Sequence, residues 1–155
     1  MQLEIHPPRY DAVIVGGSFA GLSAAMQLAR ARRRIALVDA GLPRNRYAAH
    51  SHGFLGLDGK SPTEIVRIGR QQLAAYGTVD FVDGTATLAE ESAGRFLVTM
   101  DDGRVLHASR LVLATGMRDE LPALPGLQER WGQTVLHCPS VSYTHLRAHE
   151  TPEHL

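Results

Sequence analysis

The segment from residue 11 to residue 21 constrains the fold more than any other part of the sequence. It reads Asp-Ala-Val-Ile-Val-Gly-Gly-Ser-Phe-Ala-Gly, a short continuous apolar run that ends in glycines. Such a run is typical of a strand that is buried on both faces of a sheet. Apolar residues then recur at helical spacing, at positions 22, 25, 26 and 29, and arginines follow them. We therefore predict a strand, a glycine turn and a helix.

A second apolar run, Ile35 to Val38, stops at Asp39. Strand, helix and strand within about 30 residues form the βαβ unit of a parallel sheet. The chain has 155 residues, of which 44% are hydrophobic. That is enough for one hydrophobic core and too little chain for two full domains.

The remaining elements follow from turn and capping signals. Residues 40–59 form a long loop rich in Gly, Arg and His, and loops of this length are often functional. Ser61-Pro-Thr-Glu64 is a capping box that opens a helix, which Gly77 would end. Residues 79–88 indicate a further strand with Gly84 inside it.

The C-terminal half contains an antiparallel insertion and one more buried strand. Residues 95–100 and 104–107 form a predicted hairpin around the Asp102-Gly103 turn. Residues 111–115 are the last apolar strand, which ends at Gly116. Residues 117–125 resemble a linker, because prolines at 122 and 125 stop regular structure.

The glycine turn has the residue types that a dinucleotide-binding site needs. Gly16 allows a tight turn, a small residue at 18 lets the backbone approach a pyrophosphate, and Gly21 lets the helix pack close to the sheet. The helix N-terminus offers N–H groups and a positive dipole end to phosphates. At position 18 such sites usually have glycine, and this sequence has Ser18. We expect the serine side chain to leave less room between the backbone and a pyrophosphate without preventing their contact. The candidate binding residues are Gly16, Gly17, Ser18, Phe19, Ala20 and Gly21.

Asp39 stands 23 residues after Gly16, at the end of the second strand, and Ala40 follows it. A carboxylate there accepts hydrogen bonds from an adenosine ribose and repels a 2′-phosphate, so the ligand is FAD or NAD and not NADP. An ordinary strand-to-helix turn is the alternative. The acidic residue in its expected place favours the dinucleotide site.

The inserted hairpin, followed by Leu111-Val-Leu-Ala114-Thr115-Gly116, resembles the FAD domain of flavoproteins with two dinucleotide-binding domains. The resemblance implies an α/β fold: a truncated Rossmann-like FAD-binding domain with a parallel sheet and an inserted antiparallel hairpin. It also implies that Ala114, Thr115 and Gly116 lie near FAD, where the chain leaves for the NAD(P)H domain. The long loop runs under the flavin in such proteins, so we expect Arg44 and His52 to contact phosphate or ring; an ordinary surface loop is the alternative. Ala86, which follows the loop in sequence, is also an expected cofactor-binding residue.

Within that group the chain resembles the thioredoxin-reductase-like branch of the pyridine nucleotide-disulfide oxidoreductases. Residues 40–59 have no cysteine, and residues 131–139 resemble the approach to the Cys-x-x-Cys motif of that branch. The resemblance implies that Cys138, the single cysteine of the chain, is a catalytic residue that exchanges with a substrate disulfide. Its partner would stand at position 141, where this sequence has Val141.

Residues 141–151 read Val-Ser-Tyr-Thr-His-Leu-Arg-Ala-His-Glu-Thr, which resembles the translation of a transposase-type sequencing adapter over eleven consecutive residues. We therefore expect residues 141–155 to be a non-native tail. His145 and His149 stand four residues apart, a spacing at which two metal ligands share one helix face. Both lie in the expected non-native tail, so we expect no metal site. The expected domains are 1–117, the N-terminal part of the FAD-binding domain, and 118–140, a linker and the start of an NAD(P)H domain.

Composition limits the partners. The chain has a formal net charge of zero and therefore lacks the excess of basic residues that is typical of nucleic-acid-binding proteins. No apolar stretch reaches about 18 residues and no signal peptide opens the chain, so we expect a cytoplasmic protein without a membrane partner. Fifteen arginines against one lysine indicate the codon bias of a GC-rich bacterial genome.

The first functional hypothesis is an FAD-dependent oxidoreductase that passes electrons from NAD(P)H through FAD to a Cys-x-x-Cys dithiol/disulfide. Its substrate would be a small-molecule or protein disulfide, and the full-length parent could form a homodimer. This fragment alone would be inactive. Two alternatives stay open: a non-catalytic flavin-binding module, and an oxidoreductase without redox cysteines of the ferredoxin–NADP reductase-like or NADH oxidase-like kind.

Overall fold

A computed structural model describes residues 9–132 together with 134 and 135. The described chain forms two compact units. The first contains residues 9–43 and 65–117, and the second contains residues 44–64 and the described residues from 118 onward. The first unit holds both sheets of the fold and the glycine turn, and each unit is described by itself below.

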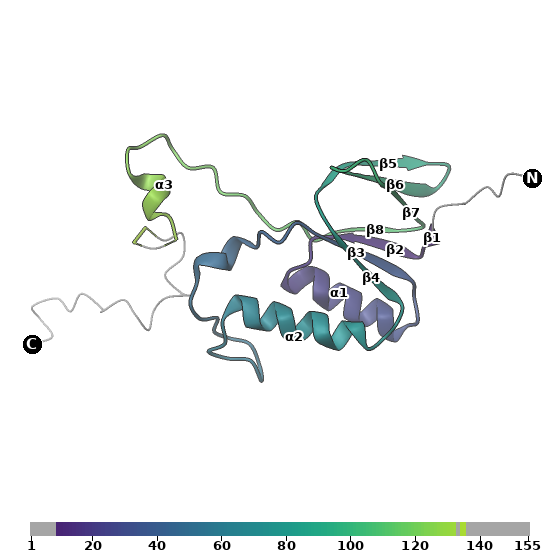
Figure 1. The fold of residues 1–155 in the computed structure, drawn as a ribbon, viewed down its shortest axis with the longest axis horizontal. Coiled ribbons are helices and arrows are strands. Elements are labelled where there is room, and N and C mark those ends of the chain that lie inside the picture. The colour runs from purple at the N-terminus through teal and green to yellow at the C-terminus, as the bar shows by residue number, and fades with distance from the viewer. Residues whose placement is uncertain (1–8, 133, 136–155) are drawn as a thin grey trace, which may run out of the picture. The chain divides into compact units, whose positions relative to one another are not determined.

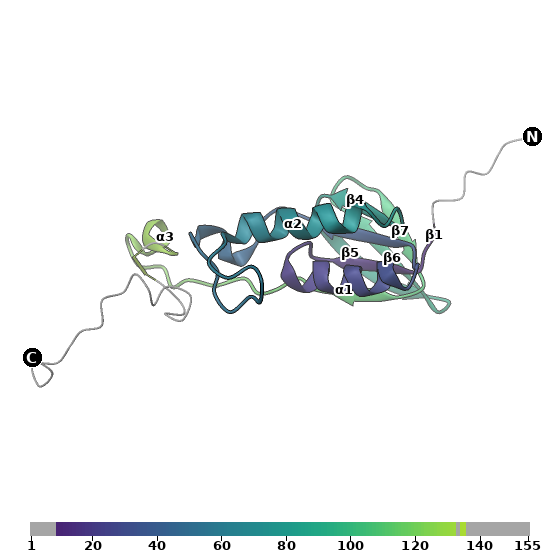
Figure 2. The same ribbon diagram turned by 90° about the horizontal axis from the view of Figure 1, so that it is seen from below.

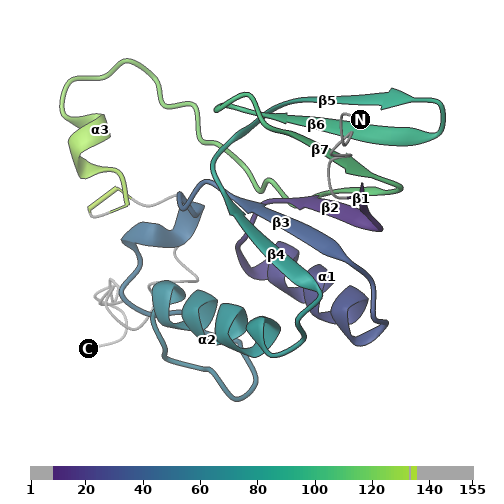
Figure 3. The same ribbon diagram turned by 45° about the vertical axis from the view of Figure 1, so that its right-hand side comes forward.

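A four-stranded parallel sheet forms the centre of the first unit. Its strands stand in the order β4 (Val79–Asp83), β3 (Ile35–Asp39), β2 (Ala12–Val15) and β8 (Leu111–Leu113). Every neighbouring pair is parallel (Figures 1 and 3). The helix α1 (Phe19–Arg30) connects β2 to β3. This confirms the predicted βαβ unit and the α/β fold class.

The central strands are buried on both faces, as their continuous apolar sequence predicts. Val13 belongs to the hydrophobic cluster on one face of the sheet, and its neighbour Ile14 belongs to the cluster on the other. Both side chains have no exposed surface. Because successive strand residues point to opposite faces, a strand covered on both sides must be apolar throughout.

Helices cover one face of the parallel sheet. α1 and α2 (Pro62–Ala74) run side by side against it (Figure 2). The helices approach closely at Gly69, where an added Cβ would lie 3.1 Å from the Cδ1 of Leu22. The buried cluster on this face is formed by Ile14, Leu22, Ala25, Ala29, Ile35, Leu37 and Leu73.

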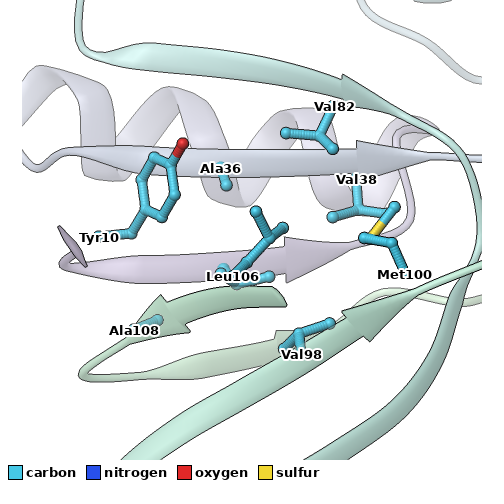
Figure 4. Packing of buried hydrophobic residues seen from close by; sticks show 9 residues of the cluster. Tyr10, Ala36, Val38, Val82, Val98, Met100, Leu106 and Ala108 are labelled. Atoms are coloured by element: carbon cyan, nitrogen blue, oxygen red, sulfur yellow. The ribbon is translucent and has the colours of Figure 1, made fainter. Parts of the chain in front are cut away.

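A second sheet covers the opposite face. Its order is β1 (Arg9–Tyr10), β7 (Val105–Ala108), β6 (Arg95–Met100) and β5 (Ala86–Ser92). β5, β6 and β7 pair antiparallel, and β1 pairs parallel with β7. Side chains of both sheets meet in one cluster (Figure 4), formed by Tyr10, Val13, Ala36, Val38, Val82, Val98, Met100, Leu106 and Ala108.

The prediction of one strand over residues 79–88 is wrong. Gly84 adopts a φ of +134°, and its N–H donates to the carbonyl oxygen of Asp39 at 3.0 Å. Glycine adopts a positive φ at no steric cost, unlike other residues. β4 therefore ends at Asp83, and the chain joins the second sheet at Ala86. A glycine inside an apparent strand therefore marks a change of sheet here.

The predicted hairpin around Asp102-Gly103 is confirmed, since β6 and β7 pair antiparallel and Gly103 has a φ of +84°. The insertion is larger than the predicted hairpin, because β5 adds a third antiparallel strand. Ala93 and Gly94 make the second turn, with φ values of +51° and +71°. Two positive φ values in succession are typical of the two-residue turns that join antiparallel strands.

The second unit consists mainly of turns. It contains a 3₁₀ turn, η1 (Arg44–Tyr47), and the short helix α3 (Leu127–Arg130). The predicted start of α2 is confirmed, because the N–H of Glu64 donates to the Oγ of Ser61 at 3.2 Å. The Glu64 carboxylate also accepts a hydrogen bond from Lys60 Nζ at 2.6 Å. The domain boundaries at 117 and 140 stay predictions, and the tail 141–155 lies outside the described residues.

Candidate dinucleotide-binding site

The carboxyl ends of the parallel strands meet at the glycine turn. Gly16 N–H donates to the carbonyl of Val38 at 2.9 Å, and Ala114 N–H donates to the carbonyl of Val15 at 2.8 Å. The chain leaves β2 toward β3 on one side and returns to β8 on the other, so the strand order reverses at this place. Open α/β sheets bind ligands at such a switch point.

Two glycines are required by close backbone contacts. Gly16 has a φ of +113°, and a Cβ added there would lie 2.1 Å from the carbonyl oxygen of Ala114. A Cβ at Gly21 would lie 1.7 Å from the carbonyl oxygen of Gly16. The structure therefore supports the tight turn expected at Gly16 and the close helix packing expected at Gly21.

Gly17 has a separate role that its sequence position alone does not indicate. A Cβ added there would lie 2.4 to 2.5 Å from the carboxyl group of Asp39. The absence of a side chain at 17 therefore allows the Asp39 carboxylate to lie directly against the turn. The structure thus brings together the glycine turn and the acidic residue that the sequence pattern pairs with it.

The N-terminus of α1 has the features of an anion site. Ser18 is the N-cap residue, with a φ of −92° and no side-chain capping bond, and the first helical bond runs from Leu22 N–H to the Ser18 carbonyl at 2.8 Å. The first-turn amides of Phe19, Ala20 and Gly21 precede this bond. No acidic side chain lies in the first turn, so an anion would compensate the positive end of the dipole.

Asp39 is held by two hydrogen bonds. Its Oδ1 accepts the N–H of Gly41 at 2.9 Å, and its Oδ2 accepts Nη1 of Arg70 at 3.1 Å. The side chain of Asp39 is 18% exposed and therefore only partly buried. Sequence reasoning missed Arg70, which lies on α2 and has no motif around it that would distinguish it.

The other predicted residues of the first unit lie around this turn or in the core. Ala114 is half-buried against Gly16, whereas Thr115, Gly116 and Ala40 are exposed. The side chain of Ala86 packs against the cluster between the two sheets. The cofactor contacts expected of these five residues stay predictions.

Arg44 and His52 belong to the second unit, and each faces a carboxylate there. Arg44 makes a two-pronged ion pair with Asp119, at 2.9 and 2.5 Å. His52 Nδ1 lies 3.4 Å from Oδ2 of Asp58. A hydrogen bond from the N–H of Gly53, and then the one from His52, lower the pKa of Asp58. The expected flavin contacts of Arg44 and His52 stay predictions.

The candidate catalytic residue Cys138 lies outside the described residues. Within the described part of the chain, no three His, Cys, Asp or Glu side chains come close enough to hold a metal ion. None of the helices among the described residues is long and apolar enough to cross a membrane.

The sequence matches the family Pyridine nucleotide-disulphide oxidoreductase over residues 10–155. The chain belongs to this family. This confirms the resemblance on which the expected fold and function depend. Among curated proteins, "Probable thioredoxin reductase" of Arthroderma benhamiae is 40% identical over 137 residues, which are 84% of this chain and 34% of the relative. Thioredoxin reductase tcpT of Claviceps purpurea is 34% identical, over 83% of this chain and 41% of the relative.

A solved structure of an oxidoreductase from Agrobacterium tumefaciens is similar in both sequence and fold. It is 55% identical, with a TM-score of 0.81, over 86% of this chain and 45% of that chain. This likeness confirms the Rossmann-like FAD-binding fold class. The chain spans about a third to two fifths of the length of the curated relatives it matches.

Membership of the family implies FAD and NAD(P)H as cofactors, and the described residues fit the adenosine diphosphate part of FAD. Gly16 and Gly17 leave a turn without side chains at a helix N-terminus, which suits a pyrophosphate. Asp39 lies against that turn with carboxylate oxygens that can accept ribose hydroxyls. The curated relatives named here are fungal, so the bacterial source indicated by the arginine content stays a prediction.

Proposed function

We propose that this chain is the N-terminal part of an FAD-dependent oxidoreductase that moves electrons from NAD(P)H through FAD to a dithiol/disulfide pair. The observation that carries the proposal is the glycine turn at the strand switch point, with the Asp39 carboxylate against it. The similarity to curated thioredoxin reductases supports the choice of a disulfide as electron acceptor.

The residues of this chain would hold and orient the cofactor. The first-turn amides of α1 would bind the pyrophosphate, and Asp39 would accept hydrogen bonds from the adenosine ribose. When bound, FAD supplies the redox chemistry that accepts a hydride from NAD(P)H, which no side chain of this unit provides. The contribution of this unit is therefore affinity and placement, not bond cleavage.

Cys138 would supply the protein's own redox chemistry. In the overall reaction NAD(P)H and one proton reduce a disulfide to two thiols, and NAD(P)⁺ is released. A Cys138 thiolate would attack one sulfur of the substrate disulfide, and the other sulfur would leave as a thiolate that takes up a proton. A second cysteine must then resolve the mixed disulfide.

A second candidate function depends on the native residue at position 141. The expected partner cysteine would stand there, and the printed Val141 is the first residue of the expected non-native tail. An oxidoreductase that uses FAD and NAD(P)H without redox cysteines, of the ferredoxin–NADP reductase-like or NADH oxidase-like kind, needs no second cysteine. A flavin-binding module without catalysis would likewise need no cysteine at position 141.

One experiment separates these functions. The complete reading frame that contains this chain should give a yellow protein whose flavin absorbance bleaches anaerobically on addition of NADH or NADPH. The reduced protein should then reduce a disulfide such as oxidised thioredoxin or 5,5′-dithiobis(2-nitrobenzoate). A Cys138→Ser variant should keep the bleaching step and lose disulfide reduction.

The possible outcomes of this experiment distinguish the three functions. Bleaching without any effect of Cys138→Ser on electron transfer would favour the oxidoreductase without redox cysteines. A yellow protein that NAD(P)H does not bleach would favour the flavin-binding module. A complete protein that binds no flavin would contradict all three functions. Homodimer formation and a cytoplasmic location belong to the same proposal, and light scattering and cell fractionation would test them.

A further inference from the structure

We propose that Arg70 is a positioning residue for the adenosine ribose of FAD, acting through the Asp39 carboxylate. The inference rests on the proposed flavin site and assigns a new residue to it. Arg70 lies on α2, in the connection between β3 and β4, 31 residues after Asp39. Nothing in the glycine turn motif includes this residue.

Three contacts hold the Arg70 guanidinium in place. Nη1 donates to Asp39 Oδ2 at 3.1 Å, and Nη2 donates to Asp83 Oδ1 at 3.4 Å. The guanidinium carbon lies 4.7 Å from the centre of the Phe81 ring, which is the geometry of a cation–π contact. A planar guanidinium that is stacked and paired on two sides has little freedom to turn, unlike a lysine ammonium at the same place.

These contacts determine which acceptor positions of Asp39 stay open. A carboxylate has about four lone-pair positions, two on each oxygen. The N–H of Gly41 uses one on Oδ1, and Arg70 uses one on Oδ2. One position therefore remains on each oxygen. Two acceptors on one rigid carboxylate match the two adjacent hydroxyl groups of a ribose.

The charges around the carboxylate support the same ligand. Arg70 contributes one positive charge, and Asp39 and Asp83 contribute two negative charges. The cluster thus carries one net negative charge, although it contains an arginine that could otherwise attract a 2′-phosphate. Because Arg70 is engaged by both carboxylates, the cluster favours a ribose with free hydroxyls over a phosphorylated one.

A purely structural role for Arg70 would have a different signature. In that case the ion pairs would only hold α2 to the ends of β3 and β4. Loss of Arg70 would then lower stability and weaken all adenine dinucleotides equally. A positioning role predicts instead that the loss depends on a ribose hydroxyl, because Asp39 must be held for that hydroxyl to be bound well.

The test uses the complete flavoprotein and two probes, FAD and FAD whose adenosine is 2′-deoxyadenosine. The flavin is removed and the dissociation constants are measured from quenching of flavin fluorescence. We expect Arg70→Gln to weaken FAD about tenfold, on the scale of one charge-assisted hydrogen bond, and to weaken the deoxy probe only about threefold, because that probe keeps one of the two hydroxyls. Arg67→Gln, on the same helix, is the matched control and should change neither value.

Two further variants complete the experiment. Arg70→Lys keeps the charge but not the stacked planar group, so FAD affinity should fall between the values for wild type and Arg70→Gln. In an Asp39→Asn background, Arg70→Gln should no longer change the ratio of the two dissociation constants. Thermal unfolding of each apo-protein shows whether the variants fold.

Equal losses for FAD and the deoxy probe, or no loss in Arg70→Gln and Arg70→Lys, would overturn the positioning role. If Arg70→Gln does not fold, Arg70→Lys alone decides between the two signatures. Failure of the proposed function is a separate result, because the wild-type protein would then bind neither probe.

Discussion

Gly16 shows at the scale of one residue how the turn depends on the absence of a side chain. Its φ is +113°, and an added Cβ would lie 2.1 Å from the carbonyl oxygen of Ala114. Gly77 also has a positive φ, +62°, but no atom lies within 4 Å of its Cβ position. A comparison of substitutions at Gly16 and Gly77 therefore distinguishes the cost of backbone strain from the cost of steric overlap.

We predict that Gly16→Ala destabilises the protein by about 3 kcal/mol or more, because strain and overlap add. Gly77→Ala should cost only about 1 kcal/mol, since strain acts alone there. Urea unfolding followed by circular dichroism measures both values. Similar losses for the two variants would mean that β8 moves away from the turn at little cost.

Arg70 shows why part of the site could not be predicted at this scale. Gly16, Gly21 and Asp39 follow a motif whose spacing has a physical cause, so the sequence alone indicates them. Arg70 reaches Asp39 only because α2 lies beside the ends of β3 and β4. The sequence of α2 indicates a helix, but it does not say which of its arginines faces a strand end.

At the scale of elements, a hydrogen bond between side chains joins β1 of one sheet to β4 of the other. Tyr10 on β1 donates its hydroxyl hydrogen to Oδ2 of Asp80 on β4, at 2.9 Å. Arg34 lies 3.7 Å from the same carboxylate oxygen. Burial, and next the hydrogen bond to Asp80, raise the pKa of Tyr10 above its ordinary value of 10.0.

This raised pKa gives a pH dependence with a definite sign. The folded state holds the Tyr10 proton more tightly than the unfolded chain does, so its contribution to stability is complete below pH 10. The contribution is lost as the pH rises through the folded-state pKa. We predict that Tyr10→Phe costs about 1 kcal/mol at pH 7, the net value of one hydrogen bond.

The difference in unfolding free energy between wild type and Tyr10→Phe should shrink above pH 10. Urea unfolding at pH 7, 9, 10 and 11 measures it, provided that both proteins refold at each pH. Tyr76→Phe, at an exposed tyrosine, is the control and should leave the profile unchanged. A constant difference across this pH range would show that the Tyr10 pKa does not distinguish the folded from the unfolded state.

The elements with a strong sequence period were predictable, and the short ones were not. β2, β3 and α1 follow from apolar runs and helical spacing, because burial on fixed faces imposes those patterns. β1 has two residues and α3 has four, too few to show a period. The change of sheet at Gly84 was missed because the pairing partner of each half is set by tertiary structure and not by local sequence.

At the scale of the molecule, the residues that we propose for the adenosine diphosphate end of FAD all lie in the first unit. They are the glycine turn, Asp39 and Arg70. Arg44 and His52, which are expected to contact the flavin ring or a phosphate, face the carboxylates of Asp119 and Asp58 within the second unit. The chain also spans only 34 to 41% of the curated relatives named above.

The residues that we propose for FAD in the first unit all belong to its adenosine diphosphate end. We therefore predict how the 155-residue chain discriminates between ADP and FAD. If the chain recognises only adenosine diphosphate, it should bind ADP and FAD weakly and with dissociation constants within about threefold of each other, a difference of less than 1 kcal/mol. The complete protein should prefer FAD by about 100-fold or more, because it adds contacts to the flavin ring. Competition between the two ligands, followed by flavin fluorescence, measures both preferences.

An Asp39→Asn variant of the short chain is the control, because it should weaken ADP and FAD by the same factor. Tight stoichiometric binding of FAD to the short chain, far above its affinity for ADP, would contradict the prediction. Residues within the chain would then hold the flavin ring, and Arg44→Gln and His52→Gln would show which of the two is responsible. A selective loss of FAD affinity in either variant would identify the ring contact, since ADP lacks the ring.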